Sequence, residues 1–584
     1  MTGETNRLTG AQVMTRVLER YGVRTVFALA GASQTVLLDE LDKNRIVIVP
    51  SRHESATVGA ADGYSRITGK VGIAMINVDQ GMPNAITGIS SAFEACSPVV
   101  ILVGRELDTW TEPEHQVDHD ELALVRSITK WARTVHGPER LGEYLDAACR
   151  RARSGRPGPV VLAFPKDFLS AAVEPGTDLD TPVDPPPKPA PSALDLARSL
   201  DLIAAAKRPL VIAGTGAAQA GAGPALRRLT ALGVPVLTNA MARGLVPEDD
   251  ALGWSWPLAQ TAAKHADLVL WLGARMGKRF GYGLAPRFDP AAVMIQVDVH
   301  ADEIGRNRPV DVGMVADARL VGDALADALE SQDYRRDPTW LKEALAERCA
   351  AIDALGRETT GAIHPYQIGR EIMAHMPPDA IFVNDGASIL TWMFGVMRIQ
   401  RERGYADHFP LGSMGMGAPL ALGIAAGARE IAAETGAAPR PVVLVTGDGS
   451  FGFYPSEYNG AVLAGLNQFV TVIANNGVWG NEHHAQPRQI GRTINAGFGD
   501  VRYDKIAEGF GCHGDRVTQP AALGPALKDA FARTDRPTVL DVVCPEPASA
   551  MGNPKLATII YSDVEETRKA HWAATHKTRA AQND

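Results

Sequence analysis

Cysteine is scarce in this sequence, and the few cysteines are not arranged for a disulfide framework or a zinc site. The five that occur are spread over 584 residues without a CxxC pair: Cys96, Cys149, Cys349, Cys512 and Cys544. An odd, scattered set of thiols is typical of proteins from reducing compartments. We therefore expect a cytoplasmic protein without structural disulfides or structural zinc.

Long hydrophobic runs and an excess of positive charge are also missing. The longest apolar runs, such as PVVILVG at 98–104, have the length of a β-strand, and the first residues show no charged stretch followed by an apolar core. With a formal net charge of -9, the chain lacks the basic surface that nucleic-acid binding requires. These absences predict that neither a membrane nor a nucleic acid is a partner.

One proline-rich stretch, EPGTDLDTPVDPPPKPAPS at 174–192, interrupts a chain long enough for three or four domains. Proline at this density excludes regular helix and favours an extended connection. Short apolar runs alternate with helix-like stretches before it and, in two further cycles, after it, as in parallel α/β sheets. We therefore expect an α/β protein of three doubly wound parallel-sheet domains with a C-terminal extension. The predicted ranges are domains 1–173, 195–335 and 365–546, a linker 174–194, a connector 336–364 and a tail or lid 547–584.

The most specific motif is VVLVTGDGS at 442–450, followed by ANN at 474–476. Asp448 and Asn475 are 27 positions apart, which leaves room for a crossover helix and the next parallel strand. Both side chains are therefore expected at the carboxyl ends of neighbouring strands, where open α/β sheets bind ligands. Oxygen-bearing side chains there suit Mg²⁺, which prefers a few protein oxygens together with ligand phosphates.

This pair of motifs resembles the thiamine diphosphate-dependent enzymes. The resemblance implies a metal site and a phosphate site: the metal ligands would be Asp448, Asn475 and the carbonyl of Gly477, and the phosphate contacts Gly447, Gly449 and Ser450. The family also has a glutamate in its first domain that bonds the aminopyrimidine ring, and Glu54 in SRHESATVGAADGYSR has that place. A carboxylate at the ring nitrogen would favour the imino tautomer, whose exocyclic nitrogen can remove the C2 proton of the thiazolium.

Three further segments are similar to cofactor contacts of this family. Met414, in GSMGMGAPLALGIAAGA, has the place of the large apolar residue that bends the cofactor. The resemblance adds Gly386, Ala387 and Ser388 of NDGAS, together with Val478 and Trp479, as cofactor-binding residues. In this family the two ends of the cofactor are held by different chains. The resemblance therefore implies a homodimer or homotetramer in which Glu54 of one subunit meets Asp448 of another.

The substrate class is predicted from the second domain. The segments MARGLVPEDD, GARMGKRFGYGLAPRF and IQVDVHADEIGRNRPVDVG resemble 2-hydroxyacyl-CoA lyases and oxalyl-CoA decarboxylases, whose central domain binds ADP or the adenine part of CoA. The segment after Arg275 lacks the FDDR-type run of many flavin-containing relatives, which argues against FAD. The substrate-binding residues predicted on this basis are Gln34, Arg275, Asp298 and Lys555.

Three side chains are predicted to act on the substrate. Glu482 follows the metal-ligand asparagine at the distance where related enzymes present a catalytic side chain, so it is a candidate acid or base. Gln116 and His119 lie in EPEHQVDHDELALVRSITKWA, a segment similar to the one that carries an active-site glutamine in acetolactate synthases.

We expect a 2-hydroxyacyl-CoA lyase, similar to the actinobacterial 2-hydroxyisobutyryl-CoA lyases. Such an enzyme cleaves the C1–C2 bond of a short 2-hydroxyacyl-CoA and releases formyl-CoA and a ketone or aldehyde. Two catalytic alternatives stay open, an acetolactate synthase-like carboligase acting on pyruvate and an oxalyl-CoA decarboxylase. A third alternative is a catalytically silent relative that only binds nucleotide.

Overall fold

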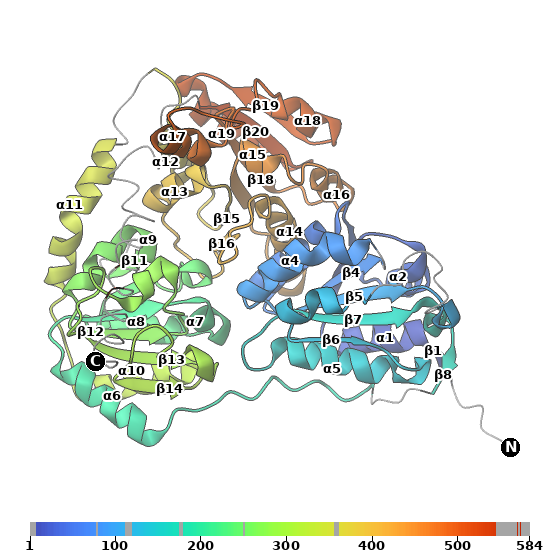
Figure 1. Cartoon of the computed structure of the whole chain (residues 1–584), viewed down its shortest axis with the longest axis horizontal. Helices are drawn as coiled ribbons and strands as arrows, with labels where there is room; N and C mark the ends of the chain where they lie inside the picture. The colour runs from blue at the N-terminus through green and yellow to red at the C-terminus, as the bar shows by residue number, and fades with distance from the viewer. Residues whose placement is uncertain are drawn as a thin grey trace.

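The computed structural model describes residues 7–77, 80–110, 120–174, 179–248, 252–355 and 361–544, together with residues 569 and 573. These residues form three six-stranded parallel sheets and one short antiparallel pair, β1 (Leu8–Thr9) with β8 (Ala172–Val173). The three units lie at the corners of a triangle, the first at the right, the central one at the left and the third at the top (Figure 1). The predicted α/β class with three parallel-sheet domains is confirmed.

The first unit has the strand order β3-β2-β4-β5-β7-β6. Its strands are β2 (Thr25–Ala28), β3 (Val47–Pro50), β4 (Gly72–Asn77), β5 (Val99–Arg105), β6 (Trp131–Thr134) and β7 (Val160–Pro165). Its α-helices are α1 (Gly10–Arg20), α2 (Thr35–Lys43), α3 (Glu54–Thr68), α4 (Gly81–Glu94) and α5 (Leu141–Arg153). All six residues of β7 are buried, as expected for a strand covered by helices on both faces.

The central unit has the order β11-β10-β9-β12-β13-β14. Its strands are β9 (Pro209–Ala213), β10 (Val236–Thr238), β11 (Gly253–Ser255), β12 (Leu268–Leu272), β13 (Val293–Asp298) and β14 (Val312–Val315). The helices α6 (Ala193–Ala205), α7 (Thr215–Ala220), α8 (Gly223–Ala231), α9 (Trp256–Ala259) and α10 (Ala318–Ser331) belong to it. The chain leaves this unit through α11 (Thr339–Leu355).

The third unit has the order β16-β15-β17-β18-β20-β19. Its strands are β15 (Ile381–Asn384), β16 (Tyr405–Asp407), β17 (Val442–Gly447), β18 (Phe469–Asn475), β19 (His513–Val517) and β20 (Thr538–Val543). Its helices are α12 (Pro365–His375), α13 (Ser388–Val396), α14 (Gly417–Thr435), α15 (Asp448–Phe451), α16 (Glu457–Leu463), α17 (Gly480–Ile490), α18 (Tyr503–Gly509) and α19 (Pro520–Ala532).

The strand orders divide the three units into two kinds. Numbered by appearance in the chain, the first and third sheets both run 2-1-3-4-6-5, whereas the central sheet runs 3-2-1-4-5-6. The central order is that of dinucleotide-binding sheets, which bind ligands where the order reverses, here between β9 and β12. The same rule places a site between β15 and β17 of the third sheet.

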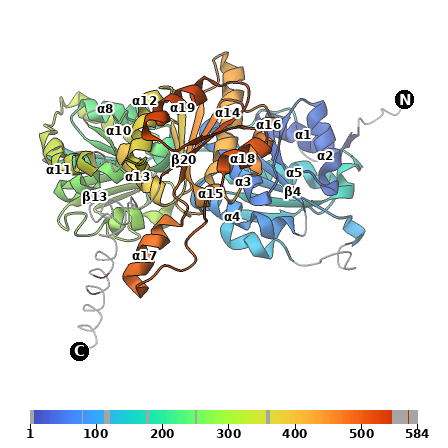
Figure 2. The ribbon, with the colours of Figure 1, turned by 90° about the horizontal axis from the view of Figure 1, so that it is seen from above.

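The first and third units pack closely through α3 and α14. A Cβ atom at Gly63 would lie 2.1 Å from the Leu420 carbonyl oxygen, and one at Gly423 would lie 1.8 Å from that of Ala60. Only glycine allows the two helix backbones to approach this closely. Seen from above, α14 and α16 lie on the side of the third unit that faces the first unit (Figure 2).

The proline-rich segment has no regular structure in its described part. Residues 179–192 form no helix or strand and cross from the first unit to α6 along the lower edge of the molecule (Figure 1). Each of the predicted ranges 1–173, 195–335 and 365–546 contains one complete sheet. The exact boundaries stay predictions, and almost all of the predicted tail lies outside the described residues.

Candidate active site

A pocket in the third unit brings together most of the predicted cofactor-binding residues. It lies at the carboxyl ends of β15, β17 and β18, beside the point where the strand order reverses. The predicted residues among its lining are Gly386, Ala387, Ser388, Met414, Gly447, Asp448, Gly449, Ser450, Val478 and Trp479. Four segments that are distant in the sequence therefore converge on one site, which we call the cofactor pocket.

Asp448 is a buried carboxylate whose hydrogen-bond partners, among the described residues, are backbone amides. It opens α15, and its two carboxylate oxygens accept hydrogen bonds from the amides of Gly449 (2.9 Å) and Gly477 (2.7 Å). Burial raises the pKa of the Asp448 carboxyl to about 7, although these backbone amides act in the opposite direction. A bound cation would relieve this desolvation, so the environment suits a metal ligand.

Asn475 and Gly477 are held beside Asp448. The Asn475 side-chain amide donates to the Asp541 carboxylate at 2.8 Å, which directs its NH₂ group into the protein and leaves Oδ1 as its acceptor. Gly477 has φ +71°, a conformation that favours glycine, and its carbonyl accepts the Phe498 amide at 2.7 Å. A carbonyl oxygen has two lone pairs, so this hydrogen bond leaves one for a further partner.

These residues fit a diphosphate held by Mg²⁺. A Cβ atom at Gly449 would lie 2.4 Å from the Trp479 ring, and one at Gly386 would lie 3.1 Å from the Gly447 nitrogen, so these glycines allow the loops of the pocket to pack closely against one another. Within the described residues, no group of three or more His, Cys, Asp or Glu side chains is placed to hold a metal ion. One carboxylate, one amide oxygen and one carbonyl form a donor set that needs phosphate oxygens to complete it, as Mg²⁺ prefers.

Glu54 is the first residue of α3, close to the third unit of its own chain. It is 7% exposed, and its Oε2 accepts a hydrogen bond from the Asn84 amide at 3.1 Å. The preceding residue, His53, caps the helix by accepting from the Ser55 amide. Glu54 does not line the cofactor pocket of its own chain. Its predicted meeting with Asp448 of another subunit stays a prediction.

Glu457, a residue that no sequence motif singled out, lies beside Glu54. Glu457 opens α16, and both of its carboxylate oxygens accept the Arg52 amide, at 3.1 and 3.3 Å. Burial raises the pKa of Glu457 to about 7, and the nearby Glu54 charge acts in the same direction. Its position nine residues after Asp448 of the GDG motif is the signal in the sequence that could have identified it. A buried carboxyl from the third unit thus supports the loop that presents Glu54.

The other predicted site residues lie apart from the cofactor pocket. Gln34 is fully buried at the end of the first sheet, where its amide donates to the Ile76 carbonyl. Glu482 is exposed in the first turn of α17, a helix without buried residues that projects from the third unit (Figure 2). Arg275 contacts Glu94 of α4, donating to its carbonyl at 2.6 Å. Gln116, His119 and Lys555 lie outside the described residues.

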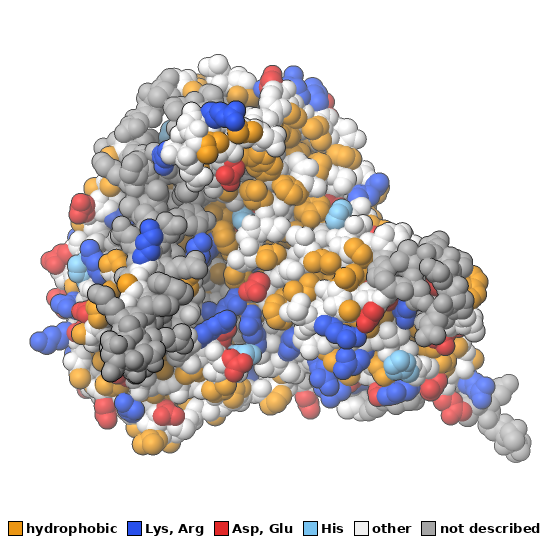
Figure 3. All heavy atoms as spheres, viewed as in Figure 1, with side chains coloured by type: hydrophobic (Ala, Val, Ile, Leu, Met, Phe, Trp, Pro, Cys, Tyr) orange, Lys and Arg blue, Asp and Glu red, His pale blue; other side chains and the backbone are white. Residues whose placement is uncertain are grey.

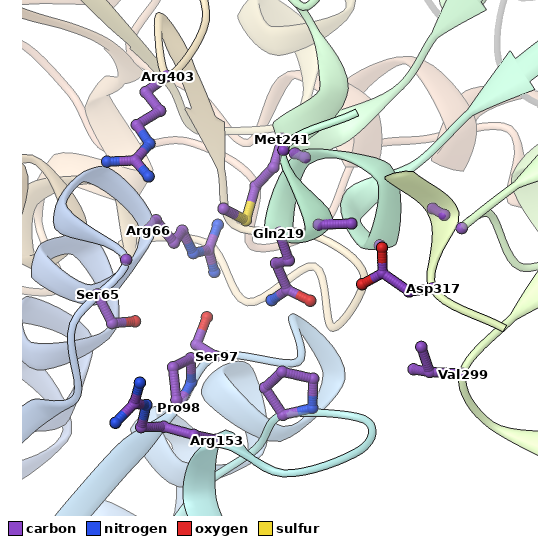
Figure 4. Close-up of a pocket in the computed structure, with 18 of the residues that line it drawn as sticks. Ser65, Arg66, Ser97, Pro98, Arg153, Gln219, Met241, Val299, Asp317 and Arg403 are labelled. Atoms are coloured by element: carbon purple, nitrogen blue, oxygen red, sulfur yellow. The ribbon is translucent and has the colours of Figure 1, made fainter. Parts of the chain in front are cut away.

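A second pocket, of about 320 Å³, lies where the three units meet (Figure 4). We call it the junction pocket. Arg66, Arg153 and Arg403 lie on the side of the first and third units, and Asp317 lies opposite on the central unit (Figure 4). The predicted Asp298 also lines it, and burial raises the pKa of that carboxyl.

The residues that line the junction pocket come from distant parts of the sequence. Its central-unit wall follows β9, β12 and β13, at the reversal of the strand order, but prolines 185–187 and 189 of the predicted linker form another wall. The linker prediction did not include a ligand-facing role for these prolines. A pocket assembled from three units and a connecting segment has no contiguous motif by which it could be found.

Comparison with known proteins identifies the class. The chain matches the models "Thiamine pyrophosphate enzyme, N-terminal TPP binding domain" over residues 8–124, "central domain" over 196–325 and "C-terminal TPP binding domain" over 385–542. The chain belongs to the thiamine pyrophosphate enzyme family. The family resemblance and the prediction of an enzyme are thereby confirmed.

Several relatives extend over nearly the whole chain. A probable acetolactate synthase of Mycobacterium bovis is 30% identical over 553 residues, 93% of this chain and 97% of the relative. A probable acetolactate synthase large subunit of Methanocaldococcus jannaschii is 29% identical over 565 residues, 93% of each chain. A solved structure, the thiamine diphosphate-dependent 4-hydroxybenzoylformate decarboxylase of Rhodococcus jostii RHA1, superposes with a TM-score of 0.80 at 21% identity, covering 93% of this chain and 100% of that one. This last likeness shows the fold.

Proposed function

We propose that this protein is a carboligase of the acetolactate synthase type, which decarboxylates a 2-oxo acid such as pyruvate and joins the remaining fragment to a second carbonyl compound. Relatives of this name align with 93% of the chain, which supports the carboligase over the 2-hydroxyacyl-CoA lyase expected from the sequence. The observation that supports an active enzyme is the cofactor pocket, in which the buried Asp448 carboxyl lies beside Asn475 and Gly477. Within the described part of the chain, the hydrogen-bond partners of this carboxyl are backbone amides and include no cationic side chain.

The chain's own residues have separable tasks in this proposal. Asp448, Asn475 and the Gly477 carbonyl would hold Mg²⁺, and the glycine-lined loops would receive the diphosphate. Bound thiamine diphosphate supplies a nucleophilic carbon and accepts the electron pair released when a carbon–carbon bond breaks. Glu54 would hold a proton at the pyrimidine nitrogen, and Met414, half-buried at the pocket, would support the bend of the cofactor.

We infer that two copies of the chain complete each site. Large apolar side chains remain exposed beside the cofactor pocket, including Phe453 at 52% and Leu411 at 41%. Apolar side chains gather on the face of the first and third units shown in Figure 3. Patches of this kind are typical of surfaces that another molecule covers. A homodimer, or a tetramer built from it, would bring Glu54 of one copy to the cofactor pocket of the other.

A 2-hydroxyacyl-CoA lyase is the second candidate, and the run GARMGKRF at 273–280 favours it because the FDDR-type run is absent. Two nearby arginines are nevertheless committed to the protein itself. Arg308 donates to the carbonyls of Gly283, Asp289, Pro290 and Ala292, and Arg287 donates to that of Arg279. In the lyase, Glu482 would act as the acid or base on the substrate hydroxyl.

ADP is proposed for the junction pocket. Arg66 is already paired with Asp62, but Arg153 and Arg403 suit phosphates, and the carboxylates Asp298 and Asp317 on the opposite side suit ribose hydroxyls. The central sheet has the nucleotide-binding strand order, which supports this assignment. Adenine nucleotide released from the purified protein on denaturation, and identified by mass, would support it. Release of FAD instead would favour a flavin-containing carboligase.

The test of function uses the purified full chain with thiamine diphosphate and Mg²⁺. Pyruvate and a panel of short 2-hydroxyacyl-CoAs are offered separately, and products are identified by mass. Acetolactate from pyruvate supports the carboligase, whereas formyl-CoA from a 2-hydroxyacyl-CoA replaces it with the lyase. Glu54→Gln is the control, and we expect it to lower turnover by about a hundredfold or more while the protein stays folded. No product from any substrate, with thiamine diphosphate unbound, would instead indicate a catalytically silent relative.

A further inference from the structure

Asp385 occupies a central place beneath the cofactor pocket without lining it. It follows β15 directly and is 1% exposed. Its carboxylate accepts hydrogen bonds from the Gly386 amide at 2.6 Å, from the Gly415 amide at 3.2 and 3.3 Å, and from the Thr446 hydroxyl at 3.2 Å. These three donors belong to three different segments of the chain. One carboxylate therefore connects segments that are up to about 60 residues apart.

Each of these segments supplies part of the cofactor pocket. Gly386 begins the loop that carries Ser388, Gly415 adjoins Met414, and Thr446 precedes the GDG loop with Asp448. Gly415 has φ +89°, and a Cβ atom there would lie 2.5 Å from Phe453, so this loop has little freedom to move. We call the three segments, 386–388, 412–416 and 446–450, the cofactor loops. Asp385 contacts all three from the protein side.

His408 faces the same carboxylate from the edge of the sheet. It follows β16, whose Asp407 pairs in register with Asn384, so His408 and Asp385 continue neighbouring strands. The His408 Nδ1 atom lies 3.0 Å from Asp385 Oδ1, and the His408 side chain is 2% exposed. A carboxylate taken this far out of water needs a partner of opposite charge or several hydrogen bonds. The hydrogen bonds come from the three segments, and the His408 imidazole is the side chain placed against the same carboxylate.

The imidazole is itself held in place from its other side. The His408 ring is stacked on Phe409, with centroids 4.6 Å apart and planes inclined by 25°. The guanidinium of Arg279, from the central unit, lies 3.6 Å from the centroid of the Phe409 ring. The orientation of His408 is therefore supported by packing, as a residue that must hold a fixed geometry requires.

We propose that Asp385 and His408 form a buried pair that positions the three cofactor loops for binding of the cofactor diphosphate. Neither residue touches the reacting atoms, so both are positioning residues. This proposal rests on thiamine diphosphate being the cofactor, but on neither of the two substrate classes. It predicts that loss of the pair weakens cofactor binding more than it weakens turnover at saturating cofactor.

The first test is Asp385→Asn in the full-length protein, freed of cofactor by chelation. Titration with thiamine diphosphate at fixed Mg²⁺ is followed by quenching of tryptophan fluorescence, since Trp479 lines the pocket, so the readout does not require a known substrate. We expect the half-saturating concentration to rise by about tenfold or more, because charge-assisted hydrogen bonds to three loops are weakened. Turnover at saturating cofactor should stay within about threefold of the unsubstituted protein.

Glu430→Gln is the matched control. Glu430 is also a buried carboxylate that joins segments, accepting the hydroxyls of Thr25 and Tyr64 at 2.7 Å each and contacting Lys70 at 2.7 Å. It lies on α14, outside the lining of the cofactor pocket. We expect this variant to lower the unfolding temperature and to leave the half-saturating concentration unchanged. Equal cofactor affinities in Asp385→Asn, Glu430→Gln and the unsubstituted protein would overturn the proposal, and so would equal weakening in both variants.

His408 gives an independent test if Asp385→Asn does not fold. His408→Leu should weaken cofactor binding, and His408→Asn, which can keep an N–H donor near the place of Nδ1, should restore most of it. In the double variant Asp385→Asn/His408→Leu the loss should be clearly smaller than the product of the two single losses, because the residues act as a pair. Fully multiplicative losses, or equal affinities in His408→Leu and His408→Asn, would contradict the pair.

Discussion

Buried carboxylates in the third unit and buried carboxylates at the contacts between the units have different hydrogen-bond partners. In the third unit, Asp448 of the cofactor pocket and Glu457 beside Glu54 are held by backbone amides, and burial raises the pKa of each to about 7. Between the units, Glu248 is buried against the Arg243 guanidinium, with two contacts of 2.7 and 2.8 Å. Asp62 is held in the same way by Arg66 at 2.7 Å.

This difference distinguishes carboxylates that are suited to bind a cation or a proton from those that stabilise the fold. The charge of a carboxylate that is already paired with arginine is compensated, so a further cation stabilises it little. A carboxylate that is buried among neutral dipoles is stabilised when a cation binds. The contrast also agrees with topology, because the first kind follows the switch of strand order in the third sheet and the second kind joins units. Four substitutions test this contrast.

Asp448→Ala should have the largest effect. Loss of the one carboxylate among the proposed metal ligands removes several kcal/mol of metal and diphosphate binding, which corresponds to about a thousandfold or more in activity at fixed cofactor. Calorimetric titration with Mg²⁺ and thiamine diphosphate gives the direct measurement. The variant should unfold at the same temperature as the cofactor-free protein or higher, since a desolvated carboxyl is removed. Retained cofactor affinity would contradict the metal-binding role of Asp448.

Arg243→Met should show the opposite behaviour. It leaves Glu248 buried without its cation, and breaking such a pair costs about 3–5 kcal/mol of stability. Glu248 keeps its hydrogen bonds from the Ile399 amide at 2.8 Å and from the Thr238 hydroxyl at 3.5 Å, neither of which supplies a cation. The unfolding temperature should fall, as measured by circular dichroism, while the affinity for thiamine diphosphate in the folded protein is unchanged. A large loss of cofactor affinity at unchanged stability would break the comparison.

The sequence predicted the local parts of this arrangement far better than the assembled ones. Asp448, Asn475 and Trp479 were found because a strand, a short turn and a crossover helix place them within one stretch of the third unit. Asp385 and His408 were missed in this role, because their contact depends on the pairing of β15 with β16 rather than on spacing. The junction pocket was missed for the same reason, since the prolines of the linker meet α7 only after three units have packed together.

Glu457→Gln tests the second unpaired carboxyl through pH. The pKa of Glu457 is raised from 4.5 to about 7 on folding, so the folded protein binds more protons than the unfolded chain between these values, and stability falls as pH rises through this window. The cost reaches at most about 3 kcal/mol above pH 7. The unfolding temperature of Glu457→Gln relative to the unsubstituted protein should therefore increase from pH 5 to pH 8. A difference that is constant over this range would show that the carboxyl is not desolvated.

Asp298→Asn is expected to have the smallest effect and to concern only the junction pocket. Asp298 ends β13, and its Oδ1 already accepts the His300 amide at 2.9 Å, so the isosteric amide should preserve the local turn. Loss of one charged acceptor for a ribose hydroxyl would weaken ADP binding by about tenfold, measured by calorimetric titration. Thiamine diphosphate affinity should not change, because the two pockets share no lining residue. Unaltered ADP binding in this variant would remove the Asp298 carboxylate from the proposed nucleotide site and leave Asp317 as its proposed contact with the ribose.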